Sequence, residues 1–482
     1  MTDRRQRAIA LPFLTLGEGF ADVVSAASFP RLTLRYRNDS AADAVGLNPL
    51  SDRQWCDHFG RFVPLPGNLP SPLALRYHGH QFRHYNPDLG DGRGFLFAQL
   101  RNDADGRWMD LGTKGSGQTP WSRLGDGRLT LKGAVREILA TELLQARGVN
   151  TSRTLSVIET HEALERRDEP SPTRSAVLVR LSHSHIRFGT FQRLAYFEDI
   201  DRLKRLCDYV VQTYPHPAHA DHANNGPAAQ VLAGAVRACA ETLAGWMAAG
   251  FVHGVLNTDN MNITGESFDY GPWRFLPAFD PNFVAAYFDH GGLYAYGRQP
   301  EAVFWNLNQL ARSLSLVSEP SVLGDILSDF EPAYHRALGK AFCRRLGVIP
   351  RSDDHNLDLA RAVTRLMASG GESLGFEPVL FDWFGGSDRQ TKAFNGPRKA
   401  YYSGEAFATF LAQLEQFEPA TPSSAIQAYH DQDEPEDMLI QQVESIWNTI
   451  DTLDDWAPLF KKLTSISALT AIKHNSQAHV NK

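Results

Sequence analysis

The spacing of apolar residues changes partway along this chain, and that change limits the folds open to it. Residues 94–100 form a short apolar run that stops at a cluster of Asn, Asp and Gly, and residues 108–114 resume the run. Two such runs around a turn cluster predict a β-hairpin. From Leu131 to Leu143 the apolar residues follow i, i+3, i+4 spacing, with Gly148 just beyond, which predicts a helix.

Two more apolar runs, residues 154–160 and 175–182, flank a polar tip at residues 165–170 and predict a second hairpin. Beyond them helical spacing dominates, most clearly over residues 228–249, which Gly250 ends. The tail after Asp451 is polar, and we expect its end to be weakly ordered. Further amphipathic helices are predicted over residues 301–316, 323–346, 357–367, 402–417 and 437–450.

A strand-rich first part followed by a helical second part predicts an α+β fold rather than alternating β–α units. The length of 482 residues allows more than one folding unit. We expect a strand-rich N-terminal lobe over residues 1–190 and a helical C-terminal lobe over residues 191–482. The boundary should fall near residues 183–200.

The composition excludes several functional classes. With 43% hydrophobic and 21% charged residues the chain is typical of globular proteins and unlike disordered ones. Its net charge of −7 opposes general binding of nucleic acid, whose phosphates attract basic surfaces. The four cysteines are far apart and lack the spacing of zinc sites or disulfide frameworks, which favours a reducing compartment.

Membrane insertion and secretion are not indicated by the sequence. No apolar run approaches the roughly 20 residues of a membrane helix. The basic residues at the N-terminus are followed by Pro12, Gly17 and Glu18 rather than by the unbroken apolar stretch of a signal sequence. We therefore expect a cytoplasmic protein without membrane contacts.

The densest motif is Leu-Gly-Asp-Gly-Arg-Gly at residues 89–94. Glycines at alternate positions let backbone N–H groups approach phosphate oxygens, although the same run also suits an ordinary tight turn. A dinucleotide fingerprint would continue into a helix, whereas a hairpin follows here. The motif therefore predicts a loop that lies over phosphates on an antiparallel sheet.

Lys114 ends the strand after this loop, and Glu137 lies in the following helix. Protein kinases use the same order, in which the Lys binds phosphates and the Glu holds the Lys. A solvated helix face is the alternative for Glu137, because Arg136 stands beside it.

A second motif follows Gly250 and contains His253, Asn260 and, nine residues later, Asp269. An amide oxygen and a carboxylate are hard ligands suited to Mg²⁺ shared with ATP phosphates. Two residues after His253, where a kinase has its catalytic Asp, stands Val255, which cannot accept a proton. Asp259 is the nearby carboxylate that can.

With these motifs, the chain resembles the selenoprotein O family, pseudokinase-fold enzymes that act as protein adenylyltransferases. The resemblance runs from about Leu73 to Leu310 and is poor after about residue 350. It rests on motifs at residues 79–82, 89–94, 114–120, 122–128, 184–189, 253–261 and 269–271.

The resemblance implies a bilobal, protein-kinase-like fold that binds ATP in a flipped orientation, so that AMP passes to a Ser, Thr or Tyr hydroxyl of a protein. It implies Asp259 as the proton acceptor, Glu137 as the residue that orients Lys114, and Asn260 and Asp269 as ligands of Mg²⁺ or Mn²⁺. ATP and protein substrates are the expected partners. The implied nucleotide contacts are Gly90, Gly92, Arg93, Lys114, Asp126, Gly127, Arg180, Arg187 and Asp269.

Several alternatives stay open at this stage. The chain could be a kinase that transfers the γ-phosphate, or an inactive scaffold that only binds ATP. Arg180 and Arg187 could be surface residues, although Arg180 follows an apolar strand and a buried charge there would need a partner. Structural roles are expected for the histidines of the motifs, which are His78, His80, His84, His183 and His185.

Overall fold

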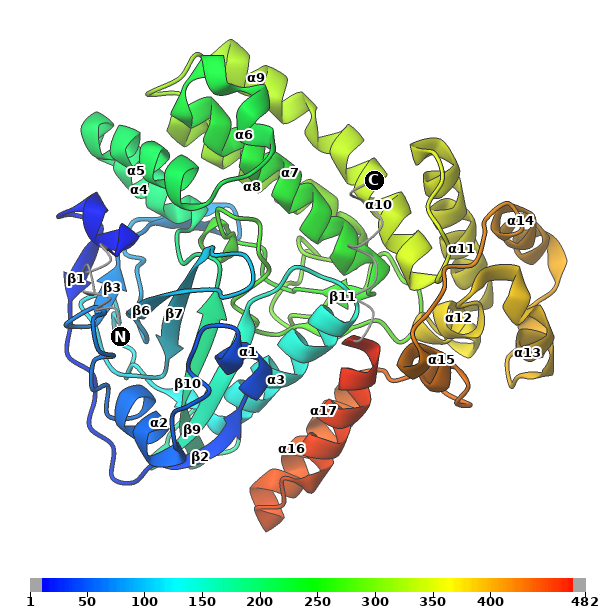
Figure 1. The fold of residues 1–482 in the computed structure, drawn as a ribbon, viewed down its shortest axis with the longest axis horizontal. Helices are drawn as coiled ribbons and strands as arrows, with labels where there is room; N and C mark the ends of the chain where they lie inside the picture. The colour runs from blue at the N-terminus through cyan, green and yellow to red at the C-terminus, as the bar shows by residue number, and fades with distance from the viewer. Residues whose placement is uncertain (1–10, 168, 471–482) are drawn as a thin grey trace, which may run out of the picture.

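An antiparallel sheet of eight strands organises the first part of the chain in a computed structural model that describes residues 11–167 and 169–470 (Figure 1). The strand order is β1-β3-β6-β7-β10-β9-β2, and the short β8 pairs with β10. The strands are β1 (Ala21–Val23), β2 (Thr33–Arg37), β3 (Leu73–Leu75), β6 (Leu96–Arg101), β7 (Trp108–Lys114), β8 (Leu129–Thr130), β9 (Arg153–Leu164) and β10 (Thr173–Ser182). Both predicted hairpins, β6–β7 and β9–β10, are confirmed.

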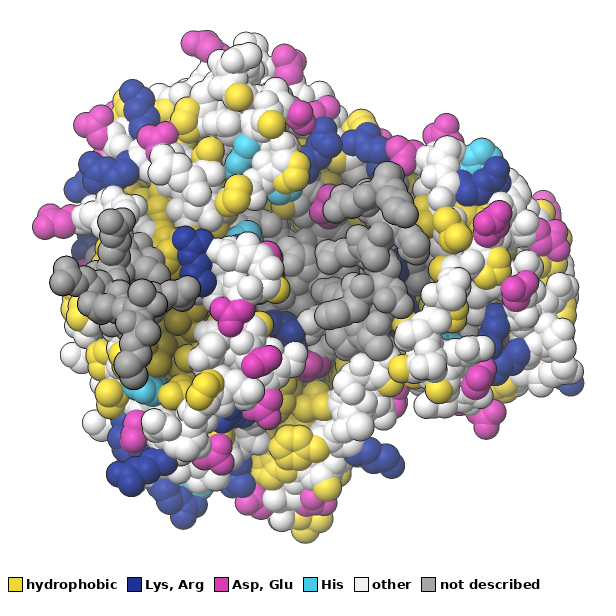
Figure 2. Space-filling view, in the orientation of Figure 1, with side chains coloured by type: hydrophobic (Ala, Val, Ile, Leu, Met, Phe, Trp, Pro, Cys, Tyr) yellow, Lys and Arg dark blue, Asp and Glu magenta, His cyan; other side chains and the backbone are white. Residues whose placement is uncertain are grey.

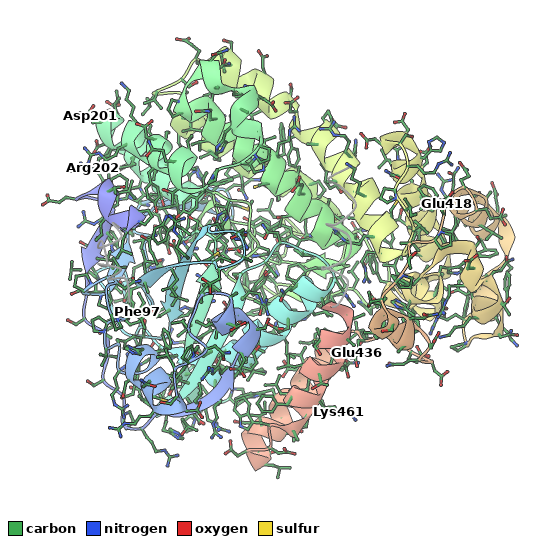
Figure 3. All side chains as sticks on the ribbon, viewed as in Figure 1. Phe97, Asp201, Arg202, Glu418, Glu436 and Lys461 are labelled. Atoms are coloured by element: carbon green, nitrogen blue, oxygen red, sulfur yellow. The ribbon has the colours of Figure 1, made fainter. Side chains whose placement is uncertain are left out.

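Both faces of the sheet are buried, because an apolar core packs on each of them. Side chains alternate between the two faces along each strand and so enter one core or the other. In β10, Val177 and Val179 face one apolar core and Leu178 faces another. The first core also contains Phe97, labelled in Figure 3, and the helices α1 (Asp39–Asp43) and α2 (Asp52–Phe59). The second core is larger and continues into the helical part of the chain.

Helix α3 (Leu131–Ala146) covers the second face of the sheet. Its N-cap is Thr130, whose hydroxyl accepts a hydrogen bond from the Gly133 N–H. The helical hairpin of α16 (Ile440–Leu453) and α17 (Ala457–Thr470) packs against α3 from the outside (Figure 1). The chain is therefore ordered well beyond Asp451, where the sequence predicts a polar tail; the end of that tail lies outside the described residues.

The second part of the chain is helical, which confirms the α+β class. The predicted helix over residues 228–249 is α7 (Pro227–Ala248). The other helices are α4 (Phe188–Tyr196), α5 (Ile200–Thr213), α6 (Ala218–Asp221), α8 (Gln299–Leu314), α9 (Pro320–Ser328), α10 (Phe330–Arg345), α11 (Asp353–Leu374), α12 (Glu377–Asp382), α13 (Gln390–Asn395), α14 (Gly404–Leu414) and α15 (Ser424–His430).

The single helix predicted over residues 323–346 is wrong, because the chain breaks into α9 and α10 at Asp329. Pro332 explains the break. Proline has no N–H to donate and its ring clashes with the preceding turn inside a helix, whereas the first turn tolerates it. The break at Asp329 leaves Pro332 in the first turn of α10.

Two short antiparallel pairs carry loops near the candidate site. One is β4 (Gly79–Gln81) with β5 (His84–Asn86), and the other is β11 (Phe251–Val252) with β12 (Arg274–Phe275). None of the helices in the described ranges combines the length and apolar character needed to cross a bilayer. Cys207, Cys239 and Cys343 are buried free thiols.

We predict that the α16–α17 hairpin stabilises the sheet through α3. Leu459 of α17 is fully buried in the large core, so Leu459→Ala should lower the free energy of unfolding by about 2–5 kcal/mol. The exposed neighbour Lys461, labelled in Figure 3, provides the control, because Lys461→Ala should change stability by less than about 0.5 kcal/mol. Urea denaturation measures both. Equal stability of the two variants would mean that the hairpin does not support the fold.

Candidate active site

A cleft of about 770 Å³ is bounded by the Gly-rich loop, the ends of β7 and β10, and the loops that follow β11. Its lining contains more cations than carboxylates, and such an excess attracts polyanions. The predicted nucleotide, metal and proton-acceptor residues all line this cleft, and Glu137 lies directly behind Lys114. The cations are Arg93, Lys114, Arg123, Arg128, Arg166, Arg180 and Arg187; the carboxylates are Asp91, Asp126, Glu165, Asp259 and Asp269.

Asp269 is the centre of an ion cluster at the inner end of the cleft. Its Oδ1 accepts a hydrogen bond from an Arg180 Nη at 2.6 Å, and its Oδ2 accepts one from Arg187. The Lys114 Nζ lies 3.8 Å from the same carboxylate and donates to the Glu137 Oε2 at 2.6 Å. Glu137 is 1% exposed, so the solvated-face alternative is wrong.

The sheet and α3 bring these residues together. Arg180 and Leu178 lie two residues apart in β10, so both side chains point to the face that α3 covers. Lys114 pairs with Leu178 across the β7–β10 ladder and shares that face. α3 crosses it with Glu137 on its buried side. Side-chain alternation in β7 and β10 and the buried side of α3 therefore bring Lys114, Arg180 and Glu137 together between the sheet and the helix.

The charges of this cluster determine the ionisation of Asp269. Burial disfavours the carboxylate, but Arg180, Arg187 and Lys114 outweigh that effect and hold the pKa of Asp269 well below its usual value. Asp269 also has a φ of 59°, a backbone conformation that non-glycine residues rarely adopt. The cluster maintains this conformation because the carboxylate is bonded to two guanidinium groups.

The glycines of the Gly-rich loop make room for the protein itself. A Cβ on Gly90 would lie 2.4 Å from the Trp121 ring, and one on Gly92 would lie 2.8 Å from the Trp121 carbonyl oxygen. The Thr119 hydroxyl donates to the Asp91 carbonyl oxygen at 2.5 Å. Residues 119–128 thus lie against the Gly-rich loop as a second loop, which we call the covering loop.

The β9–β10 hairpin holds the covering loop in place. Arg166, at the hairpin tip, donates to both Asp126 carboxylate oxygens at 2.8 and 3.2 Å, and Arg128 pairs with Glu162 of β9 at 2.8 Å. Gly127 has a φ of 70° and touches the Gly117 backbone so closely that a Cβ would overlap it. Arg93 is exposed in the cleft. Sequence patterns did not identify Arg166 or Trp121, because their roles depend on contacts between distant segments.

Asp259 lies in the one-turn 3₁₀ helix Thr258–Asn260, between β11 and Asp269. Its Oδ1 is buried without a hydrogen-bond partner among the described residues, and its carbonyl oxygen accepts a hydrogen bond from Arg187 at 2.7 Å. Burial raises the pKa of Asp259 to about 6, although Arg187 opposes the shift. Val255 also lines the cleft.

The predicted metal ligands provide oxygen donors of the right kind. The Asn260 side-chain N–H donates to the Val255 carbonyl oxygen at 3.0 Å, which directs the amide and leaves its Oδ1 to accept another partner. Within residues 11–167 and 169–470, no three His, Cys, Asp or Glu side chains lie close enough together to hold a metal ion. A cation bound by Asn260 and Asp269 would therefore complete its coordination with ligands from outside the protein, and Mg²⁺ typically takes waters and phosphate oxygens in that role.

The histidines of the motifs make internal contacts. His78 shares a hydrogen bond of 2.8 Å with the Tyr85 hydroxyl, and His80 accepts one of 2.8 Å from Gln192. His183 packs edge-on against Tyr214, and His185 is buried over Gly112, where a Cβ would overlap its ring. His84 is exposed.

We predict opposite pH effects for two carboxylates of the cleft. The raised pKa of Asp259 means that ionising it costs stability as pH rises, so the advantage of Asp259→Asn over wild type should grow by up to about 3 kcal/mol between about pH 4 and pH 7. Burial raises the pKa of Asp126, but Arg166 and Arg128 together outweigh it and hold that pKa below its usual value. Asp126→Asn should therefore lose stability relative to wild type as pH rises from about 2 to about 5. Urea denaturation at several pH values measures both slopes. Parallel slopes would contradict the assignment.

Known proteins resemble the chain along most of its length. A sequence model described as "Protein adenylyltransferase SelO" matches residues 9–467. A protein nucleotidyltransferase YdiU from Synechocystis sp. is 43% identical over 472 residues, 94% of this chain and 96% of the relative. The protein of that name from Gloeobacter violaceus is 44% identical over 461 residues, covering 93% and 92% of the two chains. The one from Trichormus variabilis is 51% identical over 335 residues, covering 69% and 67%.

These matches correct the extent of the resemblance. The family model continues past residue 350 to residue 467 and begins at residue 9, so it includes α11 to α16 and most of α17 as well as the first strands. The limits of about Leu73 and Leu310 were too narrow because they rested on polar motifs, whereas helices that pack on a core carry few such motifs. The chain belongs to the SelO family of protein adenylyltransferases.

Proposed function

We propose that this protein transfers AMP from ATP to a hydroxyl group of a protein, with Asp259 as proton acceptor and with Mg²⁺ or Mn²⁺ bound by Asn260 and Asp269. The observation that carries the proposal is a cationic cleft whose lining includes the buried carboxylate of Asp259, one oxygen of which has no hydrogen-bond partner among the described residues. Family membership supports the reaction class.

The proposal includes a protein-kinase-like fold of two lobes, residues 1–190 and 191–482. Support comes from the order of elements: a Gly-rich loop, a strand that ends in Lys114, a helix that carries Glu137, and then a helical region with the Asn260 and Asp269 loops. The Lys114–Glu137 pair of 2.6 Å is the contact that kinases use to hold the lysine on phosphates.

The cations of the cleft would bind the triphosphate. Lys114, Arg180 and Arg187 are already close together around one carboxylate, so the phosphate chain would meet preorganised donors. Arg93 is exposed at the loop and is free to turn toward the phosphates. These groups would also stabilise the charge of departing pyrophosphate. Gly90, Gly92, Asp126 and Gly127 would shape the other walls of the nucleotide site.

The side chains of Asn260 and Asp269 suit a divalent cation such as Mg²⁺ or Mn²⁺. The Asn260 amide oxygen and the Asp269 carboxylate are hard oxygen donors, and each carboxylate oxygen can accept a second partner beyond its arginine. When bound, a divalent cation would neutralise phosphate charge and fix the geometry of the leaving group. Asp269 would then be shared between the cation and the two arginines.

Asp259 would take the proton from the acceptor hydroxyl. A base is most effective when its pKa lies near the working pH, and burial raises that of Asp259 to about 6. The hydroxyl oxygen would form the new bond to the α-phosphorus, the bond to pyrophosphate would break, and the proton would pass to the carboxylate. Val255, in the position of the kinase base, cannot take this role.

We predict that Asp259→Asn lowers AMP transfer by about 10²–10⁴-fold, with little change in ATP affinity, because the role is confined to the transition state. Transfer from α-labelled ATP to a protein acceptor measures the first, and calorimetry measures the second. Near-normal transfer would refute Asp259 as the base. Transfer of γ-label instead would favour a kinase, and ATP binding without any transfer by wild type would favour an inactive scaffold.

A second prediction concerns the metal. Asp269→Ala should abolish the dependence of ATP affinity on Mg²⁺, whereas Asn260→Ala should weaken it less, because a carboxylate contributes a full charge and an amide only a dipole. Removing Asp269 also leaves the buried Arg180 and Arg187 and the partly buried Lys114 without their common partner, so the unfolding of each variant must be measured alongside. Equal ATP affinity of wild type with and without Mg²⁺ would contradict the proposed site.

A further inference from the structure

A second charged depression lies away from the cleft, between α7 and α10. It encloses about 390 Å³. Four of its lining residues are cations, Arg237 from α7 and Arg336, Lys340 and Arg344 from α10, and one, Glu241 of α7, is an acid. We call it the α7–α10 groove. Figure 2 shows several Lys and Arg side chains close together near the upper end of α10, where it follows α9.

The cations of this groove have few partners within the protein. In the ranges 11–167 and 169–470, no carboxylate forms an ion pair with Arg336, Lys340 or Arg344, and Arg237 meets only Asp329, at 3.8 Å. The pKa of Glu241 is raised by burial, although Lys340 and Arg237 oppose the shift. One acid therefore faces four cations in a chain whose net charge is −7.

The arrangement is unfavourable for the isolated helix. Arg336, Lys340 and Arg344 follow one another at intervals of four residues, and like charges with this spacing repel on a helix surface. Packing also positions Arg344: its Nε lies 2.8 Å from the point that a Cβ on Gly148 would occupy, so only a glycine leaves room for it there. An anionic partner would remove the repulsion.

The spacing of the cations indicates what kind of anion fits. Residues four apart on a helix are separated by about 6 Å along its axis, so the row spans about 12 Å. In an extended peptide, alternate residues point the same way and lie about 6.6 Å apart. Acidic side chains at every second residue of an extended segment would therefore match the row one to one.

We propose that the α7–α10 groove binds an extended segment of a partner protein in which acidic residues alternate with neutral ones. A protein is favoured over nucleic acid because the chain as a whole has a net charge of −7, which opposes binding of a continuous phosphate backbone. A single small anion would engage one or two of the four cations and leave the others unpaired.

A backbone hydrogen bond connects the groove with the segment that leads to Asp269. Asn150 lines the groove, and its carbonyl oxygen accepts a hydrogen bond of 2.9 Å from the Ser267 N–H, two residues before Asp269. If the proposed adenylyl transfer is correct, the bound segment belongs to a protein substrate that docks on this groove. That docking role rests on the proposed function; the binding itself does not.

The test measures binding of a fluorescein-labelled peptide of alternating Glu and Ser by fluorescence anisotropy, with the full chain and without nucleotide. We expect saturable binding that weakens with salt. Arg336→Glu with Lys340→Glu should weaken it by about tenfold or more. Arg336→Gln with Lys340→Gln should weaken it less, and this pair keeps the test valid if charge reversal unfolds the protein.

The matched control is Arg361→Glu with Arg365→Glu, two exposed cations four residues apart on α11, which should leave binding within about twofold. Absence of binding to wild type, or equal losses in the control, would overturn the proposal. So would equal affinity for a peptide of the same composition with its glutamates in one block. Equal binding of oligothymidine, or full displacement by inorganic phosphate, would overturn it in favour of nucleic acid or a small anion.

Discussion

The carboxylate of Asp269 is the interaction on which the candidate site depends. It lies where the sheet, α3 and the loops after β11 meet, and it is bonded to guanidinium groups of Arg180 and Arg187 with Lys114 nearby. Each of these cations is nearly buried and would be costly there without an anion. Removing the carboxylate would therefore leave the charge of these cations without its shared anion and would also disturb their positions. The left-handed backbone of Asp269 is a cost that this network offsets.

The same network links the proposed base to the proposed phosphate ligands. Arg187 donates to a carboxylate oxygen of Asp269 and to the carbonyl oxygen of Asp259. Asp259, by contrast, has a raised pKa and one oxygen without a hydrogen-bond partner in the part of the chain that the structure describes. Two carboxylates ten residues apart thus differ in ionisation because three cations stabilise the charge of Asp269, whereas burial is the largest influence on Asp259. Such a separation of pKa values is typical of sites where one acid binds charge and another exchanges protons.

The covering loop forms as much of the cleft as the proposed site residues do. Trp121 fills the space that Gly90 leaves, and Arg166 reaches from the β9–β10 hairpin to Asp126. The glycine run was interpreted as room for phosphates, whereas its packing shows that it first makes room for the chain's own covering loop. Outside this region, α16 and α17 hold α3 against the sheet, and α3 carries the glutamate that positions Lys114.

The sequence alone determined the elements whose signals are local. Apolar periodicity predicted both hairpins, α3 and α7, and motif order predicted that Lys114 and Glu137 would form a pair. It did not predict β1, β2 and β3, because strands of three to five residues are too short to show a period. Nor did it predict the break at Asp329, since the apolar spacing continues through it and Pro332, which explains the break, was not weighed against that spacing. Only the tertiary structure decided that Arg166, Trp121 and the α16–α17 hairpin belong to the surroundings of the cleft, because their partners lie far away in the sequence and contacts of that kind leave no spacing to recognise.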